Sequence, residues 1–459
     1  MAGMKTDVLF FANDVLRPHI EKDEALLQAV HVACLPGITG PSLAMPDIHQ
    51  GYGFPIGGVA AMDFHHGVVS PGGVGYDINC GVRMALTNLE AAEVRARLTE
   101  IVEEVFRQVP CGVGGQGRLE IGASGLDRIL EEGAGWMVRS GFGEPADLAR
   151  AEASGCLAGA DPDAVSPRAK QRGRPQIGTL GSGNHFLEIQ QVERIAEEEA
   201  ARAYGLHAGQ TAVLIHSGSR GLGHQVCTDF LAGMGAAMKR YQLSVPDRQL
   251  ACVPIQSEEG QRYLAAMRAA ANFAWANRQA ILHFVRAAFK KVFGSSARLS
   301  LLYDVCHNIA KRERHCVEGV PRDVLVHRKG ATRAFPAGHP EVPPEYRHVG
   351  QPVLVPGSMG TASWILAGAE GAMRESFGSV CHGAGRLLSR NKAKEGRTAA
   401  GVRQALAEQG IIVRSETGGG LVEEVPEAYK DVDAVIETVH AAGLARPVAR
   451  LRPMGVIKG

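Results

Sequence analysis

Residues 72–83 read Gly-Gly-Val-Gly-Tyr-Asp-Ile-Asn-Cys-Gly-Val-Arg and lead directly into a predicted strand over 82–88. The stretch places a carboxylate, Asp77, three residues before a thiol, Cys80, between glycine-rich turns. Glycine permits left-handed backbone angles and close approach, so both side chains can turn toward one metal ion. Taken by itself, Cys80 is more often a buried structural cysteine than a ligand. Histidine segments further along the chain change that balance.

Apolar periodicity predicts helices and strands that are interleaved without a regular βαβ rhythm. Residues 139–174, rich in glycine, proline and arginine, are expected to form a long loop or insertion. No Rossmann or P-loop fingerprint is present. We therefore predict an α+β fold, with a single large compact domain over residues 1–459 that has mixed sheets and surrounding helices. The expected strands are 56–63, 82–88, 211–215 and 353–355, and the expected helices are 24–34, 90–108, 192–204 and 258–293.

Composition narrows the class of protein. A formal net charge of +1 gives no global basic field, so any nucleic-acid contact must use a local patch. The nine cysteines are scattered without paired spacing, which indicates a reducing compartment and argues against a disulfide framework. No apolar run approaches the roughly 20 residues that span a bilayer, and the N-terminus does not read as a signal peptide. We expect a cytoplasmic protein that does not contact membranes.

Four further segments place a histidine beside glycines or polar residues. The amides and Arg220 that follow His216 could cradle an oxyanion or a phosphate. Asp304 and Asn308 could orient His307. Structural zinc sites usually show paired local ligands, whereas these residues are dispersed, which fits a catalytic site assembled from several loops. The segments are Gly181-Ser-Gly-Asn-His-Phe-Leu-Glu188, Ile215-His-Ser-Gly-Ser-Arg-Gly-Leu-Gly-His224, Tyr303-Asp-Val-Cys-His-Asn308 and Val380-Cys-His-Gly-Ala-Gly-Arg386.

The ligand types leave the metal open. One thiolate, one carboxylate and several imidazoles suit Zn, Mn, Fe or Co. A thiolate can bridge two ions, and two ions suit phosphoryl chemistry. These residues decide neither the identity nor the number of the ions.

As a set, the motifs resemble the RtcB family of GTP-dependent RNA ligases. They follow the order of that family over nearly the whole chain. Cys306 and Trp364 depart from the residues expected at their positions, and neither affects an assigned role. The matching stretches are Met45–Gly58, Asp77–Arg83, Gly181–Glu188, His216–Gly221, His307–Asn308, Arg328–Arg333, Pro356–Thr361, His382–Arg386 and Lys458–Gly459.

The resemblance implies a role for each matching residue. Two Mn(II) ions are expected, one held by Asp77, Cys80 and His185, the other by Cys80, His216 and His307. His382 would be the nucleophile that takes GMP from GTP. The expected nucleotide contacts are Asn184, Glu188, Ser358, Gly383, Ala384, Gly385, Arg386, Tyr429 and Lys458. The expected RNA contacts are Arg172, Arg220 and Arg390, with Asp47 near the incoming 5′-hydroxyl, and Arg172 belongs to a basic cluster over 168–174.

The expected function is RNA ligation through a histidine–GMP adduct, in tRNA splicing or RNA repair. The substrates implied are RNA ends with a 2′,3′-cyclic phosphate or 3′-phosphate and RNA ends with a 5′-hydroxyl. Two alternatives remain open: a metal-dependent phosphoesterase with the same site, and an RNA-binding chaperone with a structural metal. The sequence does not decide whether an activator such as archease takes part.

Overall fold

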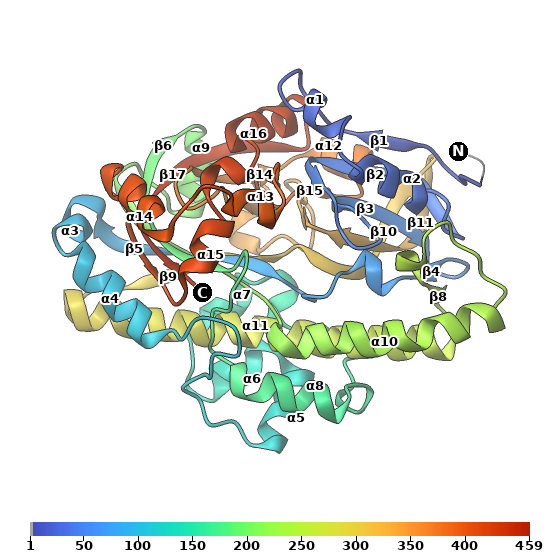
Figure 1. The fold of residues 1–459 in the computed structure, drawn as a ribbon, viewed down its shortest axis with the longest axis horizontal. Helices are drawn as coiled ribbons and strands as arrows, with labels where there is room; N and C mark the ends of the chain where they lie inside the picture. The colour runs from blue at the N-terminus through green and yellow to red at the C-terminus, as the bar shows by residue number, and fades with distance from the viewer. Residues whose placement is uncertain (1–2) are drawn as a thin grey trace.

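The computed structural model describes residues 3–459 and confirms the α+β class, with two mixed sheets and helices around them (Figure 1). The smaller sheet has the strand order β1 (Val8–Phe10), β2 (Ile38–His49), β3 (Ile56–Asp63), β11 (Val320–Lys329) and β10 (Asn308–Val317). The larger sheet has the order β13 (Pro352–Val355), β14 (Ser363–Gly368), β17 (Ala445–Lys458), β6 (Phe186–Ile195), β7 (Gln210–Ser217), β5 (Gly81–Glu90) and β9 (Leu299–Cys306). In addition, β16 (Ile412–Ser415) pairs in parallel with β17.

Two short antiparallel pairs complete the strands: β12 (Ala331–Arg333) with β15 (Ser379–Cys381), and β4 (Val68–Val69) with β8 (Val253–Pro254). Shorter helices lie around the two sheets. They are α1 (Arg17–Ile20), α2 (Ala25–Val32), α3 (Ala91–Ala96), α7 (Pro145–Ala149), α8 (Pro167–Gly173), α9 (Glu198–Tyr204), α12 (Glu370–Glu375), α13 (Arg390–Lys394), α14 (Ala399–Glu408), α15 (Gly418–Glu423) and α16 (Val432–Ala441).

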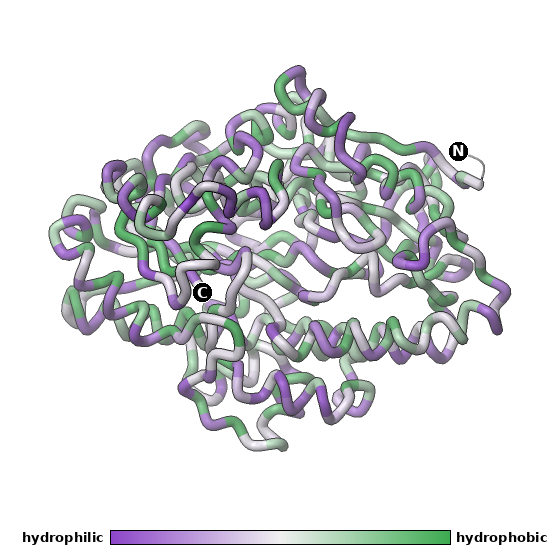
Figure 2. Tube along the Cα trace, in the orientation of Figure 1, coloured by the Kyte–Doolittle hydropathy of each residue, from purple (hydrophilic) through white to green (hydrophobic). Residues whose placement is uncertain are grey.

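The long helix α11 (Glu258–Phe293) runs with α10 (Arg220–Arg240) along one side of the sheets (Figure 1). Ser257 caps α11 by accepting a hydrogen bond from Gly260 N, and acidic residues in the first turn and lysines in the last complement the helix dipole. The central turns are buried on all sides, against α4 (Leu98–Gln108), α5 (Ala123–Glu132) and α6 (Ala134–Arg139) among others. Hydrophilic and hydrophobic residues are mixed along α10 (Figure 2), and its buried apolar side chains, which include Leu222, Val226, Met234 and Ala237, recur at helical spacing.

Most of the predicted elements are confirmed, with three corrections. Residues 192–204 are not one helix, because β6 continues to Ile195 in pairing with β17 and only α9 is helical. The helix predicted over 90–108 breaks at Arg97, whose φ of −126° separates α3 from α4. Residues 139–174 are not a long loop, since they contain α7 and α8. No helix within residues 3–459 is both long and apolar enough to cross a membrane.

Candidate metal and nucleotide site

The five predicted metal ligands converge at one end of the larger sheet. Cys80 immediately precedes β5, His185 immediately precedes β6, His216 lies in β7, and His307 follows β9. These four strands are neighbours in the order β6-β7-β5-β9, and His216 is the register partner of both Phe186 and Val82. Strand pairing therefore brings together residues that are far apart in the sequence.

The ligand atoms form two groups that share the Cys80 sulfur. In one, Cys80 Sγ lies 3.3 Å from His185 Nε2, which lies 2.7 Å from Asp77 Oδ2. In the other, Cys80 Sγ lies 3.3 Å from His216 Nε2, which lies 3.0 Å from His307 Nε2. Within each group the atoms lie within 4.8 Å of one another. These two groups have the members that the family resemblance implied.

The turn from Asp77 to Cys80 is held from outside. Asn79 has a positive φ of 54°, and its side-chain amide donates to Ala271 O (2.7 Å) on α11. The guanidinium of Arg278, also on α11, donates to Asn79 O (2.8 Å). Asp77 Oδ1 accepts hydrogen bonds from Ser219 N (2.9 Å) and Ser219 Oγ (3.2 Å). The carboxylate and thiol are thus fixed before any ligand binds.

The electrostatics of the cluster suit a divalent cation. Burial lowers the pKa of His185, His216 and His307, which favours the neutral imidazole, the form that binds a metal ion. Burial raises the pKa of the Cys80 thiol, which opposes its ionisation unless a cation lies beside it. Neutral imidazoles, a thiol and a carboxylate that point at one another are the donors of a transition-metal site. The residues therefore fit a metal ion.

His382 faces this cluster from the end of the short β12–β15 pair. It follows β15, and its ring centroid lies 4.6 Å from that of His307. Its Nδ1 lies 2.6 Å from Oδ2 of Asp47, a fully buried carboxylate in β2, and the same oxygen accepts from the main-chain nitrogens of His382 (3.0 Å) and Gly383 (3.3 Å). A Cβ on Gly385 would meet Asp47 O at 2.0 Å, so only glycine lets this loop approach β2.

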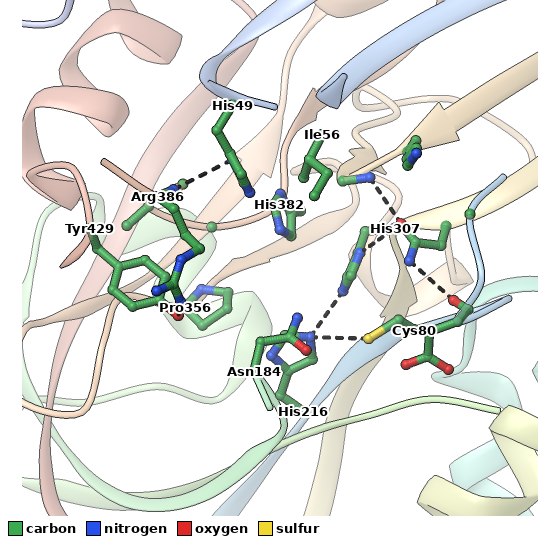
Figure 3. A pocket seen from close by; sticks show the side chains of 18 of the residues that line it. His49, Ile56, Cys80, Asn184, His216, His307, Pro356, His382, Arg386 and Tyr429 are labelled. Carbon is green, nitrogen blue, oxygen red and sulfur yellow. Dashed lines mark hydrogen bonds between the residues drawn. The ribbon is translucent and has the colours of Figure 1, made fainter. Parts of the chain in front are cut away.

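A cavity of about 380 Å³ opens onto both features (Figure 3). It is lined by Cys80, His216, His307 and His382, and on its other side by Arg386 and Tyr429, as the close-up shows. Of the predicted nucleotide contacts, Asn184, Gly383, Ala384 and Gly385 also line it. Ser358, Glu188 and Lys458 are buried and lie outside its lining.

A buried carboxylate, Glu424, organises the Tyr429 side of the cavity. It accepts hydrogen bonds from Arg386 Nη1 (3.1 Å) and from the hydroxyl of Tyr429, and its Oε2 lies 4.0 Å from Lys458 Nζ. Burial lowers the pKa of Lys458, opposed by Glu424 and Glu188. Glu424 carries no motif in the sequence, which is why sequence reasoning missed it. The partners of Arg386 within the protein also include Glu423 O and Leu388 O, so its guanidinium is anchored on this side.

The predicted RNA contacts differ in exposure. Arg390 lines the cavity and its side chain is 56% exposed. Arg172 is exposed on α8, with Nη1 donating to Gln225 Oε1 (2.8 Å) on α10. Arg220 is buried, has a φ of 55°, and lies with Nη1 3.4 Å from His185 Nδ1. Arg220 is therefore the one of the three that lies against the ligand cluster.

Of the two polar neighbours expected to orient His307, only Asn308 lies against its ring. Asn308 Oδ1 lies 3.3 Å from His307 Nδ1 and accepts from Gly330 N (3.0 Å). Asp304 points elsewhere, into a fully buried ion pair with Arg83 (2.6 Å) and Arg278 (2.8 Å). Asn308 is thus in place to orient the imidazole, and Asp304 is not.

Comparison with known proteins identifies the family. The profile of the family described as tRNA-splicing ligase RtcB matches residues 28–459. The chain belongs to the RtcB family. It is 58% identical over 452 residues to a tRNA-splicing ligase RtcB from Thermococcus kodakarensis, covering 98% of this chain and 94% of the relative. It is 54% identical over 460 residues to the protein of that name from Archaeoglobus fulgidus, covering 100% and 95%. In this RtcB chain, both ligand groups and His382 lie inside the matched region.

Proposed function

We propose that this RtcB-family protein is a GTP- and Mn(II)-dependent RNA ligase that acts in tRNA splicing or RNA repair. It joins RNA ending in a 2′,3′-cyclic phosphate or 3′-phosphate to RNA beginning with a 5′-hydroxyl. The observation that carries the proposal is the placement of His382, fixed by Asp47 and facing the ligand cluster across the same cavity. The names and the identity of the relatives support the reaction class.

The hydrogen bond to Asp47 sets the tautomer of His382. When Nδ1–H donates to Oδ2, the proton stays on Nδ1 and Nε2 keeps its lone pair. A neutral imidazole can attack phosphorus, so Nε2 forms a bond to the α-phosphorus of GTP while the bond to pyrophosphate breaks. The product is a phosphoramidate between His382 and GMP. Asp47 also stabilises the positive charge that develops on the ring during attack.

Asp77, Cys80 and His185 would hold one ion, and Cys80, His216 and His307 the other. Bound ions supply charge neutralisation for phosphate oxygens. The chain supplies orientation: Asn308 Oδ1 lies 3.3 Å from His307 Nδ1 and can accept its proton, and the Arg220 guanidinium lies 3.4 Å from His185 Nδ1. In the Gly383–Gly385 loop, the amide of Gly383 donates to Asp47 Oδ2 (3.3 Å) and that of Ala384 donates to Pro356 O (3.2 Å), so the loop is held against His382 by its own hydrogen bonds.

For the guanine, we propose a pocket formed by the groups around Glu424. Tyr429 offers a ring face, and Lys458 is a buried donor suited to the O6 acceptor, which adenine lacks. An unmade bond of this kind costs on the order of 1–3 kcal/mol, enough to favour GTP over ATP. Asn184, Glu188 and Ser358 stay proposed as further nucleotide contacts.

The later steps act on RNA. A cyclic phosphate end is hydrolysed to a 3′-phosphate, and GMP moves from His382 to that phosphate. A 5′-hydroxyl then attacks, forms the new phosphodiester and expels GMP. Arg172, Arg220 and Arg390 are the proposed phosphate contacts. The junction phosphate therefore comes from the upstream RNA.

Incubation with α-labelled GTP and Mn(II), followed by a denaturing gel, tests the first step. Wild-type protein should carry an acid-labile, alkali-stable label, and His382→Ala should carry none. His348→Ala, at an exposed histidine, is the matched control and should label normally. A wild-type yield of adduct in His382→Ala would exclude this nucleophile.

Metal analysis tests the ligands. Cys80→Ser exchanges a thiol for a hydroxyl of similar size, so a packing role predicts little change and a ligand role predicts loss of both metal and adduct. Cys252→Ser, at a buried cysteine outside the cluster, is the control. Unchanged Mn(II) content in Cys80→Ser would favour a structural thiol.

The dependence on GTP separates the alternatives. A ligase consumes GTP stoichiometrically, a phosphoesterase turns over without it, and a chaperone shows no turnover. Joining without GTP, or sealing of a 3′-hydroxyl to a 5′-phosphate, would remove the ligase proposal. The cytoplasmic location and the involvement of archease stay predictions.

A further inference from the structure

Three aromatic rings line the same cavity as the ligand cluster. Tyr52, Tyr76 and His224 come from three separate segments and form what we call the aromatic row. The rings of Tyr52 and Tyr76 meet edge to face with centroids 5.3 Å apart, and those of Tyr76 and His224 stack with centroids 5.5 Å apart at 25°. The two tyrosines are half-buried and His224 is exposed, so the row is open to the cavity. Buried core aromatics would show no such opening.

The backbone beneath Tyr52 is fixed from several directions. Gln28 forms two hydrogen bonds to Gly51, one to its carbonyl (2.6 Å) and one from its amide (2.9 Å). Gln249 Oε1 accepts from Gly53 N (2.8 Å), and Lys329 Nζ donates to Tyr52 O. The loop therefore holds its ring in place before a ligand binds, which lowers the entropic cost of stacking.

The row lies next to the ligand cluster and near the exposed guanidinium of Arg172. Tyr76 is adjacent in sequence to Asp77 of the ligand cluster. Tyr76 is the middle ring of the row, and at one end His224 precedes Gln225, whose side chain accepts from Arg172. A chain that entered the cavity along this path would meet ring faces and then a guanidinium. Alternating aromatic and cationic groups are how proteins bind single-stranded nucleic acid, with bases on the rings and phosphates on the cations.

We propose that Tyr52, Tyr76 and His224 form a nucleobase-stacking subsite for single-stranded RNA next to the ligand cluster. The inference rests on the proposed function and deepens it, because it names the part of the RNA that the cavity receives. The ligand is the base of a nucleotide at or next to a reacting end. Every base has a stacking face, so the subsite accepts all four bases. That suits an enzyme that must join ends of different sequence.

Binding of fluorescent single-stranded RNA, followed by anisotropy, tests the subsite separately from ligation. Tyr76→Ala and His224→Ala should each weaken binding by about 5- to 100-fold, the range for removal of one stacking partner. Tyr76→Phe keeps the ring and should bind within about twofold of wild type. Tyr241→Ala, at a tyrosine outside the cavity, is the matched control. Because Tyr76 adjoins Asp77, metal content is measured for each variant, and His224→Ala carries the test if Tyr76→Ala loses metal.

Abasic substrates identify the strand. One RNA lacks the base next to its 3′-phosphate, and another lacks the base next to its 5′-hydroxyl. When the missing base is the one that stacks on the aromatic row, wild-type protein should lose affinity by the same factor that Tyr76→Ala loses with intact RNA. Tyr76→Ala itself should bind this abasic RNA as well as it binds the intact RNA. The subsite would be overturned if both abasic RNAs lowered the affinity of wild type and of His224→Ala by equal factors. It would also be overturned if Tyr76→Phe bound RNA as weakly as Tyr76→Ala. Wild-type RNA binding with no joining would instead contradict the ligase proposal and leave the subsite standing.

Discussion

Lys430 contacts the backbone on both sides of Asp47, the residue that bonds to His382. Its Nζ donates to the carbonyl oxygens of Pro46 (3.2 Å) and Ile48, the two neighbours of Asp47 in the chain. Its main-chain nitrogen donates to Gly385 O (2.9 Å), in the loop after His382. Burial lowers the pKa of Lys430 to about 8. One residue therefore ties together the two segments whose alignment sets the Asp47–His382 bond.

Lys430→Met is expected to slow adduct formation by about 10- to 100-fold, because small displacements of a reacting group have large effects on rate. The KM for GTP should change less than kcat, and Lys430→Arg should recover part of the rate. Single-turnover labelling with GTP measures this, with the exposed Lys22→Met as the control. An unchanged rate in a destabilised Lys430→Met would show that the residue serves stability only.

Glu188 is a buried carboxyl group whose Oε1 has no hydrogen-bond partner within residues 3–459. Its Oε2 accepts from Gln190 Nε2 (2.6 Å). Burial, opposed by Gln190 and Lys458, raises the pKa of Glu188 to about 8, from an ordinary value of 4.5. Between these two pH values the folded protein holds a proton here that the unfolded chain has released.

The free energy of unfolding contributed by Glu188 should therefore be largest below pH 4.5 and should be lost as the pH rises toward 8. Glu188→Gln keeps the shape without the titration, so its stability should fall less than that of wild type between about pH 5.5 and 8. Urea unfolding at the two pH values measures the difference, with Glu198→Gln on the surface of α9 as the control. Parallel pH profiles for wild type and Glu188→Gln would contradict the raised pKa.

At the scale of elements, α11 supports the ligand cluster. Arg278 donates to Asn79 O (2.8 Å) and Ser217 O (3.0 Å), the carbonyls beside Cys80 and His216, and pairs with Asp304. All of these groups are fully buried or nearly so. The helix thus fixes two ligand-bearing segments through one side chain.

Removing the Arg278 guanidinium leaves the buried carbonyls of Asn79 and Ser217 without this donor and leaves Asp304 with Arg83 as its partner. Arg278→Met should lower the free energy of unfolding by about 3–5 kcal/mol and reduce the metal content. Arg268→Met, nearer the start of the same helix and bonded to Gly159 O (3.4 Å), should change neither. Chemical unfolding and metal analysis of the two variants provide the comparison. If Arg278→Met is destabilised but keeps its full metal content, the support of the ligand cluster by α11 would be contradicted.

Helices and strands were predictable from the sequence where local residues determine them. The helix over residues 258–293 was predictable because its many alanines favour a helix, and in the structure Ser257 and Gly294 cap its two ends. Residues 192–195 carry helical periodicity, yet pairing with β17 makes them a strand, and a partner more than two hundred residues away leaves no local trace. In 139–174, glycine and proline suggested a loop, while proline at the first turn of α7 and α8 in fact begins helices.

The site was predictable where motifs carried it. Asp77, Cys80, His185, His216 and His307 group as expected because each sits in a distinctive segment. The placement of Glu424 and Lys430 was not predictable, since a buried charge is recognised only by the groups that surround it. The same holds for the aromatic row, whose three rings share no sequence spacing.

For the whole molecule, the net charge of +1 means that RNA attraction depends on few cations. With Arg172, Arg220 and Arg390 as the phosphate contacts, the slope of log K against log salt for single-stranded RNA should be about −2. Arg390→Gln should reduce the magnitude of this slope by about 0.7. Arg298→Gln, at an exposed arginine, should leave the slope unchanged. Titrations at several salt concentrations measure both. A slope much steeper than this would mean that further cations take part.

The order of strands in the larger sheet has a consequence for synthesis on the ribosome. β17, the last strand in the sequence, lies between β14 and β6 and joins the two parts of the sheet. Until it emerges, a nascent chain has two incomplete half-sheets, each with an unpaired edge on which neighbouring polysomal chains can add. Closure of the larger sheet therefore waits for β17, and the interval before this strand pairs is when chaperones have the most to protect.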